Sequence, residues 1–421
     1  MLRILGPGLL FAGAAIGVSH LVMATKAGAI YGFGLVWAVL LVNLLKYPFF
    51  EFGPRYAAAT GESLIEGYRK MGWWAVAVVI FITVGTMFTI QAAVTVVTAG
   101  VAAAMLPYNI DSVTWSAIIL GICLLILTLG HYSFLDKFIK YVILVLSVST
   151  LVAVAFAWQH PAAKYPEFET QFVWNAGGIT FLIALMGWMP APLDLSVWNS
   201  IWALEKKQQL GGLQMKQSLL DFNVGYVGTV ILAFCFLSLG AFQMYGTGTE
   251  LPTRGGAFVN QLIELYTQSL GSWSRPLILA AAFTTMFSTT LTCLDAFPRV
   301  LGRIVLLFAH PDSRKDNSPN MPENNIKRTN YWIWILLVAI GALALLEFLG
   351  GQMSMMVKIA TILSFIPTPL FALLNYRLVT SQHMPKEHQP AMLLKLLSWV
   401  GLIFLTGFVG LYLFTLLNSF P

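Results

Sequence analysis

Two apolar segments of this chain are each long enough to cross a membrane, yet each is interrupted by residues that do not sustain a helix. The first, 6–31, contains Gly17-Val18-Ser19-His20, and the second, 173–204, contains Gly187-Trp188-Met189-Pro190-Ala191-Pro192. A break at membrane depth frees backbone N–H and C=O groups that hydrocarbon cannot satisfy, so something polar must meet them there. Breaks at corresponding places in two halves of a chain predict a substrate site between the inverted repeats of a secondary transporter.

The rest of the chain has the composition of a membrane protein. It is 58% hydrophobic and only 10% charged over 421 residues, and apolar runs recur at about the 20-residue length that spans a bilayer. This composition excludes a soluble globular protein. We predict an all-α integral membrane protein of the cell membrane with eleven spans, at 7–30, 33–58, 74–105, 112–130, 135–158, 173–204, 216–243, 274–305, 329–350, 353–378 and 391–418.

Lysine and arginine fall mostly in alternate connections between these spans. The positive-inside rule therefore predicts a cytoplasmic N-terminus and, with eleven spans, an external C-terminus. This bias explains the net charge of +6, so the basic balance does not predict nucleic-acid binding. The cytoplasmic set is Arg3, Arg69, Lys70, Lys137, Lys206, Lys207, Lys216, Arg299, Arg303, Arg314, Lys315, Lys327, Arg328, Arg377, Lys386 and Lys395, against chiefly Lys164, Arg254 and Arg275 on the other side.

No resident cofactor is expected, apart from a sodium ion or proton as a coupling ion. Cys123, Cys235 and Cys293 all fall inside spans and share no metal-ligand spacing, so we expect them to pack as small apolar residues. The expected partners are the lipid bilayer and a small inorganic ion, and we expect a monomer. Residues 245–270 predict an external loop followed by an interfacial helix, and 310–328 predict a cytoplasmic loop.

Several motifs resemble the Nramp family of divalent-metal transporters. Leu5-Gly6-Pro7-Gly8-Leu9-Leu10 and Tyr31-Gly32-Phe33-Gly34-Leu35-Val36-Trp37 are similar to its first two helices, Thr60-Gly61-Glu62-Ser63-Leu64 to the end of helix two, and Met189-Pro190 to the Met-Pro of helix six. The resemblance covers nearly the full length. It implies one domain, 1–421, with a LeuT-like fold of five plus five inverted repeats and with helices one and six broken. Repeat one would occupy about 7–158, repeat two about 173–378, and an extra helix about 391–418.

The chain departs from this family where the family binds its metal. The family's Asp-Pro-Gly-Asn of helix one, whose Asp and Asn bind the metal, is replaced by Gly17-Val18-Ser19-His20. Its Met-Pro-His-Asn of helix six becomes Met189-Pro190-Ala191-Pro192, and the acidic pair of helix three falls on Val94 and Val97. A divalent cation needs fixed negative charge or several strong ligands. Met189 is therefore expected to bind metal only if the family's activity is retained.

What remains at the breaks suits an anion. The second half of each broken helix is expected to present free N–H groups and the positive end of its dipole to the cavity. Ser19 and His20 add hydrogen-bond donors at the first break. The alternative for His20 is a packing histidine whose hydrogen bonds are satisfied within the protein. We predict a small anion such as bicarbonate, with a divalent cation (magnesium, manganese or iron) as the alternative. The predicted substrate-binding residues are Gly17, Val18, Ser19, His20, Met186, Trp188, Met189, Ala191 and Asp194.

Two places are candidates for a coupling ion. Thr285, Ser288 and Thr289 lie on a hydroxyl-rich face of span eight and resemble the sodium site that LeuT-like transporters hold between helices one and eight. The alternative is that these hydroxyls bond to their own helical turn. Asp194 is either a proton or coupling-ion site, or an acid that stabilises the first turn of its own helix.

Lys46, Glu51 and Arg55 place charges at membrane depth on span two. Glu51 and Arg55 are four residues apart, so we expect them to pair on one helix face and neutralise each other. A membrane sensor and an ungated channel are alternatives to a transporter. Hydrolysis is disfavoured because neither a His-Glu-x-x-His nor a Gly-x-Ser-x-Gly motif is present.

Overall fold

The helices of the computed structural model coincide with the eleven predicted spans. Each span matches one, two or three consecutive helices to within about five residues at either end. The structure describes residues 6–106, 108, 110–129, 132–164, 173–210, 212, 214–248, 259–261, 263–264, 267, 271–309 and 326–418. The predicted loop and interfacial helix at 245–270 and the predicted loop at 310–328 lie largely outside these residues.

The elements follow one another along the chain without a described strand. They are α1 (Pro7–Ala15), η1 (Ser19–Ala24), α2 (Thr25–Tyr31), α3 (Val36–Thr60), α4 (Leu64–Met71), α5 (Trp73–Met105), α6 (Ser112–Leu129), α7 (Tyr132–Gln159), α8 (Ala176–Trp188), α9 (Leu195–Gln209), α10 (Met215–Gln243), η2 (Ser272–Ser274), α12 (Arg275–Ala309), α13 (Ile326–Phe348), α14 (Met353–Phe365), α15 (Thr368–Thr380), η4 (Lys386–His388) and α16 (Met392–Asn418).

Length and apolar composition qualify part of this set as membrane spans directly. Within the described residues, six helices are long and apolar enough to cross a bilayer, and a seventh is added if the bent pair Pro7–Ala15 and Ser19–Tyr31 counts as one span. Three more apolar helices, Ser112–Thr128, Ile143–Gln159 and Gly177–Trp188, are shorter. A span that is broken does not qualify by this criterion, because each of its halves is too short to cross the membrane alone.

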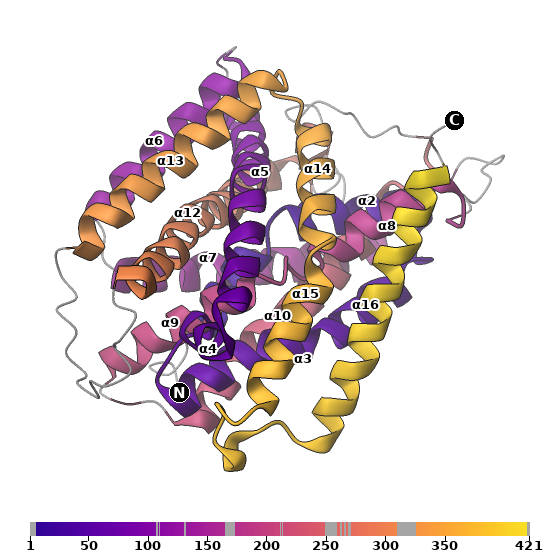
Figure 1. The fold of residues 1–421 in the computed structure, drawn as a ribbon. Coiled ribbons are helices and arrows are strands. Elements are labelled where there is room, and N and C mark those ends of the chain that lie inside the picture. Colours follow the sequence, from indigo (N-terminus) through magenta and orange to yellow (C-terminus); the bar gives the residue numbers. More distant parts are fainter. Residues whose placement is uncertain are drawn as a thin grey trace.

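The helices pack around a core that their apolar faces share. In Figure 1, α5 runs through the middle of the molecule, α6 and α13 lie side by side at one edge, and α16 lies at the opposite edge. Contacts of α5 with α12, α13 and α14 tie the centre to both sides. In the outer helices α13 and α16, 28% and 22% of the residues of the apolar stretch are buried, the smallest shares among the qualifying spans, as expected of lipid-facing helices.

The predicted span at 353–378 agrees with one membrane span, Met353–Thr380, that contains a single turn between two helices. Residues 353–378 form two helices, because α14 ends at Phe365 and α15 begins at Thr368 after a turn at Ile366 and Pro367. Proline lacks an N–H and clashes with the preceding turn, which favours a helix start at this point. The turn lies against the second predicted break, since a Cβ on Gly187 would lie 2.9 Å from that of Phe365.

The broken first helix lies against α10 along its whole length. A Cβ atom on Gly225 would lie 1.9 Å from the carbonyl oxygen of Gly8, and one on Gly28 would lie 1.9 Å from that of Leu237. Only glycine permits backbones to approach this closely, a common device where helices meet in a membrane. The contacts of Gly8, Gly225, Gly28 and Gly240 with the facing backbone are called the glycine seam below.

Helix α10 also supplies the cap that α1 lacks. Gly6 is the N-cap residue of α1 and has no side chain that could accept a hydrogen bond from the free N–H groups of this helix. The carboxylate of Asp221, which is buried on α10, accepts from the N–H of Gly6 at 2.8 Å and from that of Gly8 at 2.7 Å. A negative charge at this position also stabilises the helix dipole. The start of α1 is thereby attached to α10 before the chain reaches the break.

The glycine seam can be tested with two glycines of the same helix. We expect Gly225→Ala to destabilise the protein by about 1–3 kcal/mol, because the new methyl group has no room against Gly8. Gly228→Ala is the matched control, since nothing lies within 4 Å of a Cβ there, and it should leave stability unchanged or slightly raised. Thermal unfolding of the purified protein in detergent measures both, and equal melting temperatures would contradict the close packing.

Candidate substrate site at the two helix breaks

The first break follows Ala15, where α1 ends. The chain then turns through Ile16, Gly17 and Val18 and resumes as the wide turn η1 at Ser19, with a bend of 48° between the two halves. The carbonyl oxygen of Gly17 accepts from the N–H groups of His20 and Leu21, at 3.2 and 2.9 Å. Of the first N–H groups of this half, those of His20 and Leu21 are therefore already paired, whereas those of Val18 and Ser19 make no hydrogen bond in the described structure.

Ser19 and His20 connect this break to its surroundings. The Ser19 hydroxyl lies 2.8 Å from the carbonyl oxygen of Ala15, 3.2 Å from that of Pro190 and 2.6 Å from His20 Nδ1. His20 Nε2 donates to the Thr229 carbonyl on α10 at 2.9 Å, and the imidazole is fully buried. The proton on Nε2 leaves Nδ1 as the acceptor for Ser19 when the ring is neutral. Ser19 thus bridges the two breaks, while His20 holds the first break against α10.

The second break begins at Met189, after α8, and ends at Asp194, before α9. Its freed carbonyls are satisfied by a lysine from α3. Lys46 Nζ donates to the carbonyl oxygens of Met186 and Gly187, both at 2.8 Å, and lies 3.4 Å from that of Ala191. Lys46 is 0% exposed. Three ammonium hydrogens face three backbone oxygens, so the positive charge of the protein itself occupies the negative end of the α8 dipole.

Asp194 stands on the other side of this break, directly before α9. Its side chain makes no capping hydrogen bond to that helix, and its Oδ1 atom is buried without a partner among the described residues. Leu195, Ser196 and Val197 instead donate their N–H groups to backbone carbonyls of the same turn. Asp194 and Lys46 are close enough for their charges to interact. Both roles predicted for Asp194, a proton or coupling-ion site and an acid that stabilises the first turn of α9, stay predictions.

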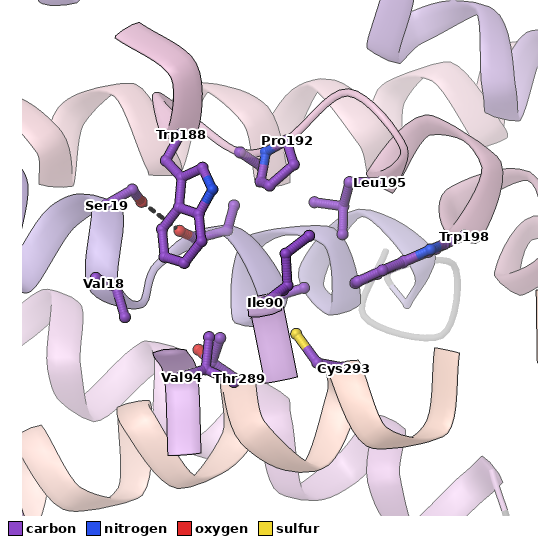
Figure 2. A pocket seen from close by; sticks show the side chains of 13 residues that line it. Val18, Ser19, Ile90, Val94, Trp188, Pro192, Leu195, Trp198, Thr289 and Cys293 are labelled. Atoms are coloured by element: carbon purple, nitrogen blue, oxygen red, sulfur yellow. Dashed lines mark hydrogen bonds between the residues drawn. The ribbon is translucent and has the colours of Figure 1, made fainter. Parts of the chain in front are cut away.

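A small cavity lies where the two breaks meet α5 and α12 (Figure 2). Its volume is about 30 Å³, enough for about one water molecule. Figure 2 shows the Trp188 indole beside Ser19 at the cavity, with Thr289 and Cys293 below it. The lining residues are Ala14, Ala15, Val18, Ser19, Ile90, Val94, Trp188, Ala191, Pro192, Leu195, Trp198, Thr289 and Cys293.

Only some of the predicted substrate-binding residues line this cavity. Val18, Ser19, Trp188 and Ala191 line the cavity. Gly17, His20, Met186, Met189 and Asp194 are buried around it without lining it. The Trp188 indole N–H is a buried donor with no partner in the described structure. The cavity therefore offers the Trp188 N–H as a donor and no carboxylate oxygen, while the single proton of the Ser19 hydroxyl is already directed to acceptors of the protein.

The positions that carry metal ligands in the resemblance hold none here. A Cβ on Gly17 would lie 2.9 Å from Thr289 Oγ1, so an aspartate at this position would collide with α12. Val94 lines the cavity, and Val97 is buried beside it on α5. Among the residues that the structure describes, no three His, Cys, Asp or Glu side chains are grouped to hold a metal ion. Met189 alone is a weak, soft ligand.

The hydroxyl-rich face of α12 is bonded mostly to its own helix. Thr285 donates to Ala281 and Ser288 donates to Thr285, at 2.7 and 2.8 Å, as hydroxyls in membrane helices commonly do. Thr289 differs because its hydroxyl also reaches the first break, 2.9 Å from the Gly13 carbonyl oxygen and 3.4 Å from that of Ile16. Sodium at Thr285, Ser288 and Thr289 stays a prediction.

The polar residues of span two have two different roles. The predicted pair of Glu51 and Arg55 is confirmed, with Arg55 Nε 2.8 Å from Glu51 Oε2. The sequence analysis missed the role of Lys46. One signal was available: no acid lies three or four residues from Lys46, and Glu51 is five away. A buried lysine without a partner on its own helix must find oxygen atoms elsewhere.

Solved structures with the same arrangement include a manganese transporter and a Na⁺-coupled symporter. A mutant of the Eremococcus coleocola manganese transporter matches 99% of this chain and 88% of its own with a TM-score of 0.68 at 14% identity. A Na⁺-coupled sialic acid symporter matches with a TM-score of 0.57 at 14% identity, over 95% of this chain and 87% of its own. MhsT in complex with L-phenylalanine matches at 0.60 and 12% identity, over 97% and 98%. The fold is therefore LeuT-like, with helices one and six broken.

The sequence pattern of the family described as natural resistance-associated macrophage protein-like matches residues 8–415. An uncharacterized protein of Pasteurella multocida is 35% identical over 412 residues, which cover 97% of this chain and 91% of that protein. The chain belongs to the Nramp family. It is a multi-pass membrane protein and a transporter, not an enzyme, and the resemblance read from the sequence motifs is confirmed.

Lys46 should be central to the stability of the second break. Lys46→Met removes the donor to Met186 and Gly187 and leaves two buried carbonyls unpaired, which costs about 2–4 kcal/mol. Lys70→Met is the control, because Lys70 pairs with Glu62 in a partly exposed ion pair worth at most about 1 kcal/mol. Unfolding in detergent should separate the two variants, and equal losses of stability would argue against the role of Lys46.

Proposed function

We propose that this protein is a secondary active transporter that moves a small anion, bicarbonate being the best candidate, by alternating access. The observation that carries the proposal is Lys46. Its ammonium group takes the carbonyl oxygens of Met186 and Gly187 at the second break, and these are the oxygens that a substrate cation would need as ligands. The protein's own cation thus stands where a metal site would require oxygen and negative charge.

A donor at the cavity supports the same proposal. Trp188 lines it, and its indole N–H has no partner in the described part of the chain. An anion accepts a hydrogen bond from such a group, whereas a metal ion cannot. The nearby carboxylate, Asp194, is outside the lining. Bicarbonate is larger than the water-sized cavity, so binding requires the two breaks to move apart, as alternating access provides.

A divalent cation is the second candidate, and membership of the family favours it. The manganese transporter of Eremococcus coleocola has the same fold, and Met189 keeps the side chain that matches a metal ligand. Against this candidate, the cavity holds no carboxylate, and Thr289 occupies the space that an aspartate at Gly17 would need. A metal ion carried with its own water shell requires fewer protein ligands, which makes magnesium the member of this class to test first.

Coupling and orientation complete the proposal. Sodium is the proposed coupling ion because Thr289 joins α12 to the carbonyls of the first break, and a proton carried through Asp194 is the alternative. The charge bias of the connecting loops places the N-terminus in the cytoplasm and the C-terminus outside. We propose that the protein works as a monomer.

Substrate class can be decided with the purified protein in liposomes. We expect saturable uptake of radiolabelled bicarbonate that depends on an ion gradient, with no uptake of manganese, iron or magnesium above that of empty vesicles. A thermal-shift screen gives an independent reading, because a ligand that binds the folded state raises the melting temperature. Stabilisation by magnesium or manganese, with none by bicarbonate or other anions, would exclude the anion and restore the metal candidate.

The coupling ion is tested at α12. Replacing Ser288 and Thr289 together by Ala should abolish the sodium dependence of uptake, because Thr289 loses its link to Gly13 and Ile16. Thr284→Ala is the control, since Thr284 bonds only to its own helix at Ala280 and Ala281. Retained sodium dependence in the double variant would move coupling away from this face, with Asp194 and protons next.

A further inference from the structure

The second half of broken helix six, α9, meets α12 beyond the small cavity. Trp198 of α9 and Cys293 of α12 both line the cavity, and Figure 2 shows them at the end of it that lies away from Ser19. The backbone of α9 packs mainly on α3 and α1, and it approaches α12 at few points. Helix α9 is therefore joined to α12 mainly through side chains.

The first of these side-chain contacts is a pair of aromatic rings next to the cavity. Trp198 and Phe297 are both buried, with ring centroids 4.9 Å apart and ring planes at 79° to each other. Rings in this edge-to-face arrangement attract each other beyond the gain from burial. Phe297 lies about one helical turn after Cys293 on α12. The ring pair therefore stands between the cavity and the later turns of both helices.

An ion pair follows about two turns further along α9. Arg299 Nη1 lies 3.3 Å from Glu205 Oε1 across the two helices, and Arg299 Nε donates to Asp295 Oδ2 of its own helix at 2.6 Å. The Tyr331 hydroxyl of α13 donates to the other oxygen of Asp295 at 2.6 Å. Because Asp295 and Tyr331 position the guanidinium in front of Glu205, less side-chain freedom is lost when the ion pair forms.

The larger internal space lies on the opposite side of the breaks. A cavity of about 220 Å³ lies between η1, α2, α8 and α14. Val22 and Met23, which follow the first break, form part of its wall. Glu205 and Arg299, in contrast, lie in the halves of α9 and α12 that the positive-inside rule directs toward the cytoplasm. The contacts between α9 and α12 therefore close the predicted cytoplasmic side of the site.

We propose that the Trp198–Phe297 ring pair and the Glu205–Arg299 ion pair form an inner gate, which closes the substrate site from the cytoplasm and separates when α9 moves away from α12. The inference rests on the alternating access of the proposed function, but not on which ion is carried. A partly exposed ion pair is weak enough to break in every transport cycle. Arg299 keeps Asp295 as a partner when the gate opens, so its charge is never left unpaired.

The inner gate is tested with the thiol of Cys293, which lines the cavity. Inverted membrane vesicles, which turn the cytoplasmic face outward, are treated with a membrane-impermeant thiol reagent, and mass spectrometry measures Cys293 separately from Cys123 and Cys235. We expect Glu205→Gln to raise the rate of Cys293 modification about twofold to fivefold, because losing a partly exposed ion pair shifts the population toward the open gate. Phe297→Leu should raise this rate about twofold to tenfold, because the ring pair is lost.

Glu66→Gln is the matched control. Glu66 pairs with Arg303 of the same helix α12 at 2.9 Å, but it belongs to α4, which is not part of a broken helix. Glu66 also accepts from the Ser63 N–H at the start of α4, and glutamine can do the same. Modification of Cys293 should stay at the wild-type rate. Faster modification of Cys123 and Cys235 would reveal unfolding, and a variant that shows it is set aside in favour of the other gate variant.

The outcomes separate the inner gate from the proposed function. Unchanged Cys293 modification in Glu205→Gln and Phe297→Leu, or faster modification from the external face in right-side-out vesicles, would overturn the inner gate and leave anion transport in place. Absence of modification in every variant would overturn it too, because the cavity would then not open past these side chains. Faster modification in a protein that carries manganese or magnesium would keep the inner gate and reject the anion.

Discussion

The backbone groups that two broken helices leave exposed inside a membrane are the constraint on which this structure depends. Hydrocarbon offers them nothing, so the protein must supply a partner for each. Lys46 closes the end of α8 by donating to the Met186 and Gly187 carbonyls, and Ser19 bridges the first break to Pro190 of the second. These contacts hold α3, η1 and the α8–α9 turn at one point. The small cavity lies next to this point, and Ser19 forms part of its wall.

The sequence predicted the positions of the spans and of the two breaks better than the contacts made by the side chains of the site. Span positions and both breaks follow from local patterns: apolar runs, Gly17, and the prolines at 190 and 192. The Glu51–Arg55 pair follows from helical spacing on one helix. The partner of Lys46 could not be predicted, because it depends on how α3 registers against α8, which no local pattern records. The same holds for His20, whose position at the break indicated a substrate contact, whereas its side chain reaches the Thr229 carbonyl on α10.

Family membership favours a divalent cation as the substrate of this chain, whereas the small cavity at the breaks has no carboxylate in its lining. The fold agrees with that of the manganese transporter of Eremococcus coleocola at 14% identity, which shows how little sequence the arrangement requires. What a fold transports is decided by a few side chains at the breaks. Here glycine and valine occupy the places of acids, Thr289 fills the space beside Gly17, and a lysine holds the carbonyls.

The glycine seam bears on how such a molecule can move. Backbones in direct contact cannot slide past one another, because a shift of even part of a turn would bring a neighbouring side chain into the space that a glycine leaves. The halves of the first helix and α10 must then travel as one rigid body, and Asp221 fastens its end. The cavity lies between this body and a second one formed by α5 and α12, which are packed against each other and contribute Ile90, Val94, Thr289 and Cys293. A movement that opens the cavity on this side would therefore have to separate α1, η1, α2 and α10 from α5 and α12.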